Sequence, residues 1–170
     1  MGQKIKKRKR KGSMASVLCR IFGCVILLVV IASLLPITVP RFMGYEIYNV
    51  ISGSMEPEIP VGSIAYIRPT DPVALEEGDV IAFNDHGSVI IHRVVSNHMV
   101  EGYLITKGDA NEEEDIGEVT YPVVRGIVVQ HFPVIGQLMM VYATTLGKTL
   151  LLCLAFSGAL LNVLAGRFRE

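Results

Sequence analysis

The stretch DVIAFNDHGSVIIHRVVSNH, residues 79–98, decides the fold of the central part of the chain. Residues 79–85 and 88–98 are rich in valine and isoleucine, and Asn84-Asp85-His86-Gly87 between them is a hairpin turn signal. Comparable short runs occupy residues 45–52, 63–69, 99–109 and 122–129. The sequence therefore predicts a mainly β domain, built as a small antiparallel sheet or a partly closed barrel.

An apolar segment precedes this domain. Residues 21–40 are 20 uncharged residues, which as a helix would cross the roughly 30 Å of a hydrocarbon core. A cleaved signal peptide is the competing interpretation, but its apolar region is usually only about 7–15 residues long. We therefore expect an uncleaved transmembrane anchor.

A second apolar stretch follows the domain. Residues 149–166 are 18 uncharged residues, with Arg167 and Arg169 beyond them. Their length suits a second membrane span, with the ammonium group of Lys148 reaching the outer interface. A shallow amphipathic helix or a buried segment is the alternative.

The charges are segregated along the chain. Of 170 residues, 16 are basic and 16 acidic; seven of the basic residues fall in the first eleven positions, whereas residues 42–133 hold four basic and 15 acidic ones. The basic start predicts a cytoplasmic N-terminus. We expect a basic cytoplasmic tail (1–20), a transmembrane anchor (21–40), an extracytoplasmic β-domain (41–136), a C-terminal hydrophobic segment forming a second transmembrane helix (137–166) and a cytoplasmic end (167–170).

Composition excludes several classes of protein. With 51% hydrophobic residues and three cysteines outside the β-domain, the chain is neither disordered nor a disulfide scaffold. The acidic middle makes nucleic acid an unsuitable partner. We expect no cofactor.

Three side chains with complementary chemistry lie where predicted strands meet loops: Ser54, His92 and Asp109. A serine hydroxyl becomes a nucleophile when a histidine takes its proton and a carboxylate orients that histidine. The structural alternatives are turn residues for Ser54 and Asp109, a core histidine for His92, and a solvated acidic loop for residues 112–115.

A metal site is a further alternative, because His86, His92 and His98 recur at intervals of six residues and would share one face of a continuous strand. The turn residues between His86 and the following run break that register. We therefore expect no metal site.

The order of motifs resembles the type I signal peptidases, in the endoplasmic-reticulum-like branch also found in archaea and some Gram-positive bacteria. After the anchor comes SGSMEP, residues 52–57, similar to the nucleophile box, and then PVGSI, residues 60–64. GDVIAF, residues 78–83, leads to IHRVV, residues 91–95, where this branch has histidine in place of the bacterial lysine. TKGDAN, residues 106–111, resembles the last box, with Ala110 in place of a common asparagine.

The resemblance implies roles for individual residues. Ser54 would be the nucleophile, His92 the general base and Asp109 its acidic partner, while Asp115 aligns with a second family aspartate. Ser52 matches a position whose hydroxyl joins the oxyanion hole in the bacterial branch, together with the backbone N–H of Ser54.

The function implied is a membrane-bound serine endopeptidase that cleaves signal peptides from exported precursors. Its partners would be those precursors, the lipid bilayer and accessory membrane subunits. The location would be the cell membrane, or the endoplasmic reticulum membrane in a eukaryote, with more than one span. A non-catalytic membrane-anchored β-domain that binds other proteins is the alternative.

Overall fold

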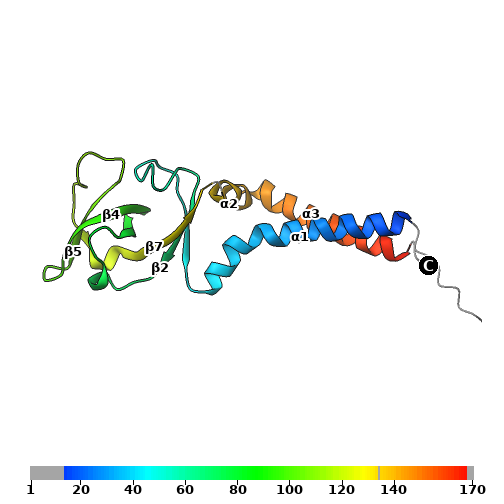
Figure 1. Cartoon of the computed structure of the whole chain (residues 1–170), viewed down its shortest axis with the longest axis horizontal. Helices are drawn as coiled ribbons and strands as arrows, with labels where there is room; N and C mark the ends of the chain where they lie inside the picture. Colours follow the sequence, from blue (N-terminus) through cyan, green and yellow to red (C-terminus); the bar gives the residue numbers. More distant parts are fainter. Residues whose placement is uncertain (1–13, 134, 168–170) are drawn as a thin grey trace, which may run out of the picture. The chain divides into compact units, whose positions relative to one another are not determined.

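A computed structural model describes residues 14–133 and 135–167, and Figure 1 shows its helices and strands. The predicted basic tail lies outside the described residues up to position 13, as does the cytoplasmic end from position 168. The elements are α1 (Met14–Phe42), β1 (Glu46–Asn49), β2 (Ile64–Arg68), η1 (Pro72–Ala74), β3 (Val80–Asp85), β4 (Ser88–His98), β5 (Tyr103–Lys107), β6 (Val119–Thr120), η2 (Tyr121–Val123), β7 (Val124–Phe132), α2 (Ile135–Ala143) and α3 (Thr145–Arg167).

The contacts within the chain divide it into two units. One is helical and combines the chain up to Leu35 with the chain from Thr144 onward, and the other is Pro36–Ala143. The second unit holds the seven strands and α2. All the residues proposed to carry chemistry belong to it.

Among the residues that the structure describes, two helices are long and apolar enough to cross a membrane: α1 with 29 residues and α3 with 23. They pack closely within the helical unit, because Gly158 lies against the backbone of Gly23 and the Cys24 thiol contacts the Asn162 carboxamide at 3.4 Å. Within the expected segment 137–166, α2 ends at Ala143 and a separate helix, α3, begins at Thr145.

The strands form one antiparallel sheet in the order β1-β2-β7-β3-β4-β5-β6. The edge strands β1 and β6 each pair with one neighbour, so the sheet is not closed. A mainly β domain flanked by apolar helices is therefore confirmed, in the open-sheet form.

The predicted hairpin joins β3 to β4. Its two central residues, His86 and Gly87, have φ angles of 44° and 86°, as a two-residue type I′ turn requires. The turn fixes the register in which Ile81 lies opposite His92.

Both faces of β3 are covered by core. Ile81 and Phe83 belong to one hydrophobic cluster, whereas Ala82 between them belongs to another. Alternate strand residues point to opposite faces, so β3 runs through the middle of the domain. Its apolar sequence follows from burial on both sides.

Strand β4 has an edge that is only partly used. It pairs with β3 from Ser88 to Arg93, but its pairing with β5 begins only at Arg93. Residues 88–92 therefore present an edge that β5 does not cover, and His92 stands at the end of this segment.

Candidate active site

Ser54 lies in the loop between β1 and β2 and is fixed by the core beneath it. The next residue, Met55, is 1% exposed and packs in the same cluster as Ile59. The Ile59 N–H donates to the Met55 carbonyl at 2.8 Å, which closes the turn. Burial of Met55 thus holds Ser54 at the surface of the core, and Met55 is a packing residue of the core.

The loop after β5 supports Ser54 from another direction. The Ala110 N–H donates to the Ser54 carbonyl at 2.9 Å. A Cβ atom on Gly108 would stand 2.6 Å from the same carbonyl oxygen. Only glycine allows this approach, so the TKGDAN box contributes backbone contacts that position the nucleophile candidate.

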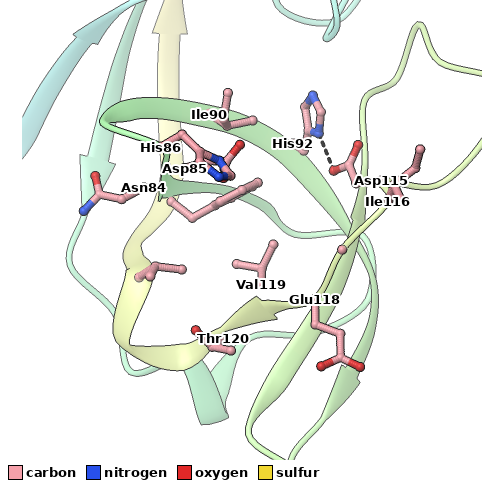
Figure 2. Close-up of a pocket in the computed structure, with 13 residues that line it drawn as sticks. Asn84, Asp85, His86, Ile90, His92, Asp115, Ile116, Glu118, Val119 and Thr120 are labelled. Atoms are coloured by element: carbon pink, nitrogen blue, oxygen red, sulfur yellow. Dashed lines mark hydrogen bonds and ion pairs between the residues drawn. The ribbon is translucent and has the colours of Figure 1, made fainter.

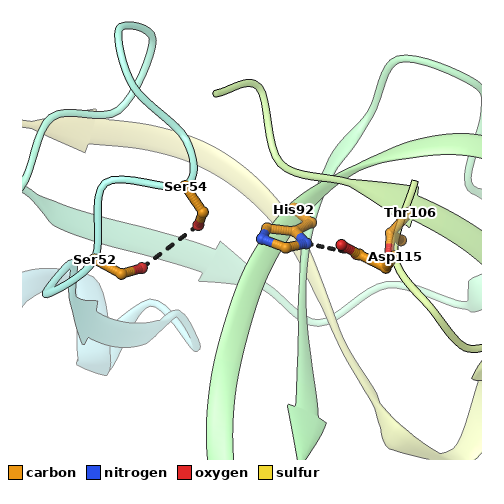
Figure 3. Close-up of polar contacts among 5 residues, drawn as sticks. All are labelled: Ser52, Ser54, His92, Thr106 and Asp115. Atoms are coloured by element: carbon orange, nitrogen blue, oxygen red, sulfur yellow. Dashed lines mark hydrogen bonds and ion pairs between the residues drawn. The ribbon is translucent and has the colours of Figure 1, made fainter. Parts of the chain in front are cut away.

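His92 is held by a carboxylate from the end of the same loop. Its Nδ1 lies 2.5 Å from Asp115 Oδ2, and its ring packs edge-on against Phe83 with centroids 6.3 Å apart. The imidazole is buried. Because Nδ1 is engaged by Asp115, Nε2 is the nitrogen free to exchange a proton, and Figure 3 shows the ring lying between Asp115 and Ser54.

Thr106 completes the environment of this carboxylate. Its hydroxyl donates to Asp115 Oδ2 at 2.6 Å, and its own carbonyl accepts the Asp115 N–H at 2.9 Å. Thr106 is fully buried. No role for Thr106 followed from the sequence, although its place in the TKGDAN box was an available signal.

Asp109 faces a different partner. Its two carboxylate oxygens accept from Arg93 Nε at 2.8 Å and Arg93 Nη2 at 2.6 Å, and these bonds raise the pKa of the Arg93 guanidinium. Arg93 also donates to the Gly78 carbonyl at 2.8 Å. His92 and Arg93 are successive strand residues and point to opposite faces. The structure therefore brings Asp115 to His92, which differs from the expected pairing of His92 with Asp109.

The Ser54 hydroxyl faces Ser52. The two Oγ atoms are 3.4 Å apart, and Figure 3 marks this contact and none between Ser54 and His92. Both serines and His92 line one cavity of about 340 Å³. Its remaining walls come from residues 48–51, Met55, Ile59 and residues 88–91.

The two other histidines of the series at intervals of six residues, His86 and His98, contact different residues. His86 Nδ1 lies 2.7 Å from Asp85 Oδ1, whereas His98 Nε2 lies 3.1 Å from Ser96 Oγ and its ring stacks on Tyr103. Among residues 14–133 and 135–167, the structure brings together no group of three or more metal-ligating side chains.

A serine hydroxyl and an imidazole that contacts a carboxylate line one cavity, and these are the side-chain types that serine hydrolases use. No family model matches the chain. Signal peptidase I W of Bacillus subtilis is 39% identical over 85 residues, which are 48% of this chain and 45% of that protein. The signal peptidase complex catalytic subunit SEC11 of Debaryomyces hansenii is 38% identical over 73 residues, 40% of this chain and 43% of the relative.

SEC11 of Saccharomyces cerevisiae strain YJM789 is 38% identical over 72 residues, 39% of this chain and 42% of that subunit. The chain therefore spans less than half the length of the curated relatives it matches. These relatives confirm the resemblance to type I signal peptidases that the motifs predict.

Proposed function

We propose that this protein is a membrane-anchored serine endopeptidase that removes signal peptides from exported precursor proteins. The observation that carries the proposal is the bond from His92 Nδ1 to Asp115, which leaves Nε2 on the side of Ser54. The similarity to signal peptidases supports the choice of substrate.

In the proposed reaction, Ser54 Oγ turns from Ser52 toward His92 and attacks the scissile carbonyl. His92 Nε2 takes the hydroxyl proton, and Asp115 stabilises the imidazolium that forms. His92 then gives the proton to the leaving amine, and water releases the acyl group from Ser54. Asp109 and Arg93 hold the loop that supports Ser54.

The oxyanion would be stabilised by the Ser54 backbone N–H and the Ser52 hydroxyl. Ser52 Oγ, 3.4 Å from Ser54 Oγ, lies near where the negative charge would develop. Such donors act most strongly when they are in place before the charge forms.

The substrate would bind as an extended strand in the cavity beside Ser54. One wall is the segment 48–52 and the other is the edge of β4 at residues 88–92, which β5 leaves uncovered. Main-chain hydrogen bonds to such an edge would align the precursor, and the limited cavity would favour the small residues that precede cleavage sites.

The helices α1 and α3 would hold the enzyme at the bilayer, with the N-terminus in the cytoplasm and the β-domain on the other side. Ser54 follows the end of α1 by 12 residues, so only a short stretch of chain separates it from the proposed anchor. The enzyme would act there on precursors that are themselves membrane-inserted, alone or with accessory membrane subunits.

The test uses the purified full chain in detergent and a synthetic precursor peptide with an apolar segment and small residues before the expected cut. We expect cleavage at one bond, reduced by more than about 10³-fold in Ser54→Ala and His92→Ala. His98→Ala is the matched control, because His98 lies on the same strand but contacts Ser96 and Tyr103. Cleavage by Ser54→Ala at the wild-type rate would refute the proposal and favour a non-enzymatic binding domain.

A further inference from the structure

A second cavity lies on the other side of His92. It has a volume of about 410 Å³, and Ile90 and His92 line both it and the cavity that holds Ser54. These two residues are therefore shared by two cavities, one that also has Ser54 in its lining and one that also has Asp115.

The chemistry of peptide cleavage gives the two spaces different occupants. The general base also protonates the leaving amine, so the amine must lie on the imidazole side of the nucleophile. The chain before the scissile bond then remains in the cavity beside Ser54. The chain after that bond continues past His92 toward the second cavity.

The lining of the second cavity combines buried or half-buried apolar residues with exposed acidic ones. Phe83, Ile90 and Val119 supply apolar surface, and Asp85 and Glu118 supply carboxylates. Figure 2 shows Asp85 and Glu118 separated by Val119 in this view. This combination suits the alkyl stem and charged end of a lysine or arginine side chain.

The negative charge of Glu118 is available to a ligand. Asp85 is paired with His86, and Asp115 with His92. Glu118 takes part in none of the ion pairs found among the described residues 14–133 and 135–167.

We propose that this second cavity binds the segment immediately following the scissile bond and favours a basic side chain there, an inference that rests on the proposed function. Glu118 is the specificity-determining residue, and Asp85 is a second carboxylate in the lining. An extended chain advances about 3.3 Å per residue, and we assign the second and third residues after the cut to this cavity.

The experiment measures kcat/KM for three precursor peptides that differ only at the second and third residues after the cut, carrying lysine, glutamine or glutamate. We expect lysine to be preferred over glutamate by about 5- to 20-fold at low salt. The ratio of kcat/KM for the lysine peptide to that for the glutamate peptide should approach 1 in 1 M NaCl, where salt screens charges over about 3 Å. In the double variant Asp85→Asn, Glu118→Gln it should fall below about twofold at low salt.

Glu113→Gln is the matched control, because Glu113 is exposed on the same loop as Glu118 and does not line the cavity. This variant should keep the wild-type preference. Equal cleavage of the three peptides, or a preference that survives in the double variant, would overturn the assignment of the cavity.

Binding of the same fluorescent peptides to Ser54→Ala protein separates this proposal from the proposed function. Anisotropy should show the same order of affinity without any cleavage. If the wild-type protein cut no peptide, the peptidase proposal would fail, and the order of affinities in Ser54→Ala would still decide whether the cavity selects basic residues.

Discussion

A methyl group added at Gly108 should reduce catalysis by displacing Ser54. The new Cβ would stand 2.6 Å from the Ser54 carbonyl oxygen and 2.8 Å from Asn111 Nδ2, whereas ordinary contact begins at 3.4 Å. The Asn111 side chain can rotate away, but the Ser54 carbonyl belongs to the backbone. Gly108→Ala therefore requires the two loops to separate by about 0.8 Å, and a misplacement of about 1 Å can lower a rate 10²-fold.

We expect Gly108→Ala to lower kcat by about 10- to 100-fold. The free energy of unfolding should fall by about 1–3 kcal/mol, the usual range for an overpacked site. The assay is steady-state cleavage of a precursor peptide by the detergent-purified chain, with thermal unfolding followed by circular dichroism.

The control is Ala110→Ser, which adds one atom to an exposed side chain two residues further along the same loop. It should retain the wild-type kcat and midpoint of unfolding. If Gly108→Ala matched the wild type in both measurements, the close approach of Gly108 to Ser54 could not be what positions the nucleophile.

Four further substitutions, with Thr106→Ser as a recovery variant, test individual polar side chains. Asp115→Asn should lower kcat by about 10²- to 10⁴-fold, because Asp115 contacts His92. Asp109→Asn should mainly lower the free energy of unfolding, by about 1 kcal/mol, because its partner is a partly exposed arginine. Steady-state kinetics measure the first effect and denaturant titration measures the second. Thr106→Val should lower kcat about 10-fold at unchanged KM, with recovery in Thr106→Ser, measured by the same kinetics. Burial raises the pKa of Tyr66 in the folded protein. The neutral phenol therefore contributes stability that is present below the unfolded pKa of about 10 and is lost as pH rises through the folded pKa. Tyr66→Phe should flatten this alkaline loss of stability, measured by urea titrations at a series of pH values.

Each of these predictions has a contrary outcome. Equal loss of kcat in Asp109→Asn and Asp115→Asn at full folding would mean that both carboxylates act in catalysis. A rise in KM alone for Thr106→Val would indicate a role in substrate binding. An unchanged alkaline decline in Tyr66→Phe would assign the decline to other groups.

Strands β3 and β4 could be predicted because the residue types that strands and a tight turn require are visible in the local sequence. Valine and isoleucine runs, with a turn at His86-Gly87 that needs positive φ, leave little choice for β3 and β4. The two-residue strand β6 gives no such signal. The boundary between α2 and α3 falls in an apolar run without proline, where the only local mark is Thr144, whose hydroxyl accepts the Gly147 N–H.

The partners of Ser54 and His92 depended on tertiary structure. The motif order identified Ser54 and His92 as candidates, but it made Asp109 the acidic partner of His92 and Asp115 only a second aspartate of the family. Strand alternation directs Arg93 to the face opposite His92, and the loop after β5 determines which aspartate reaches each of them. Neither Thr106 nor the contact of Gly108 with Ser54 can be derived from spacing alone.

The stretch from Gly108 to Asp115 touches Ser54 at its beginning and His92 at its end. A local opening of this stretch would therefore release Ser54 and His92 together. A state in which only one of the two keeps its contact with the stretch would be rare. Amide hydrogen exchange at Ala110 and Asp115 should then share a single opening free energy, and one proteolytic nick between them should silence the protein completely.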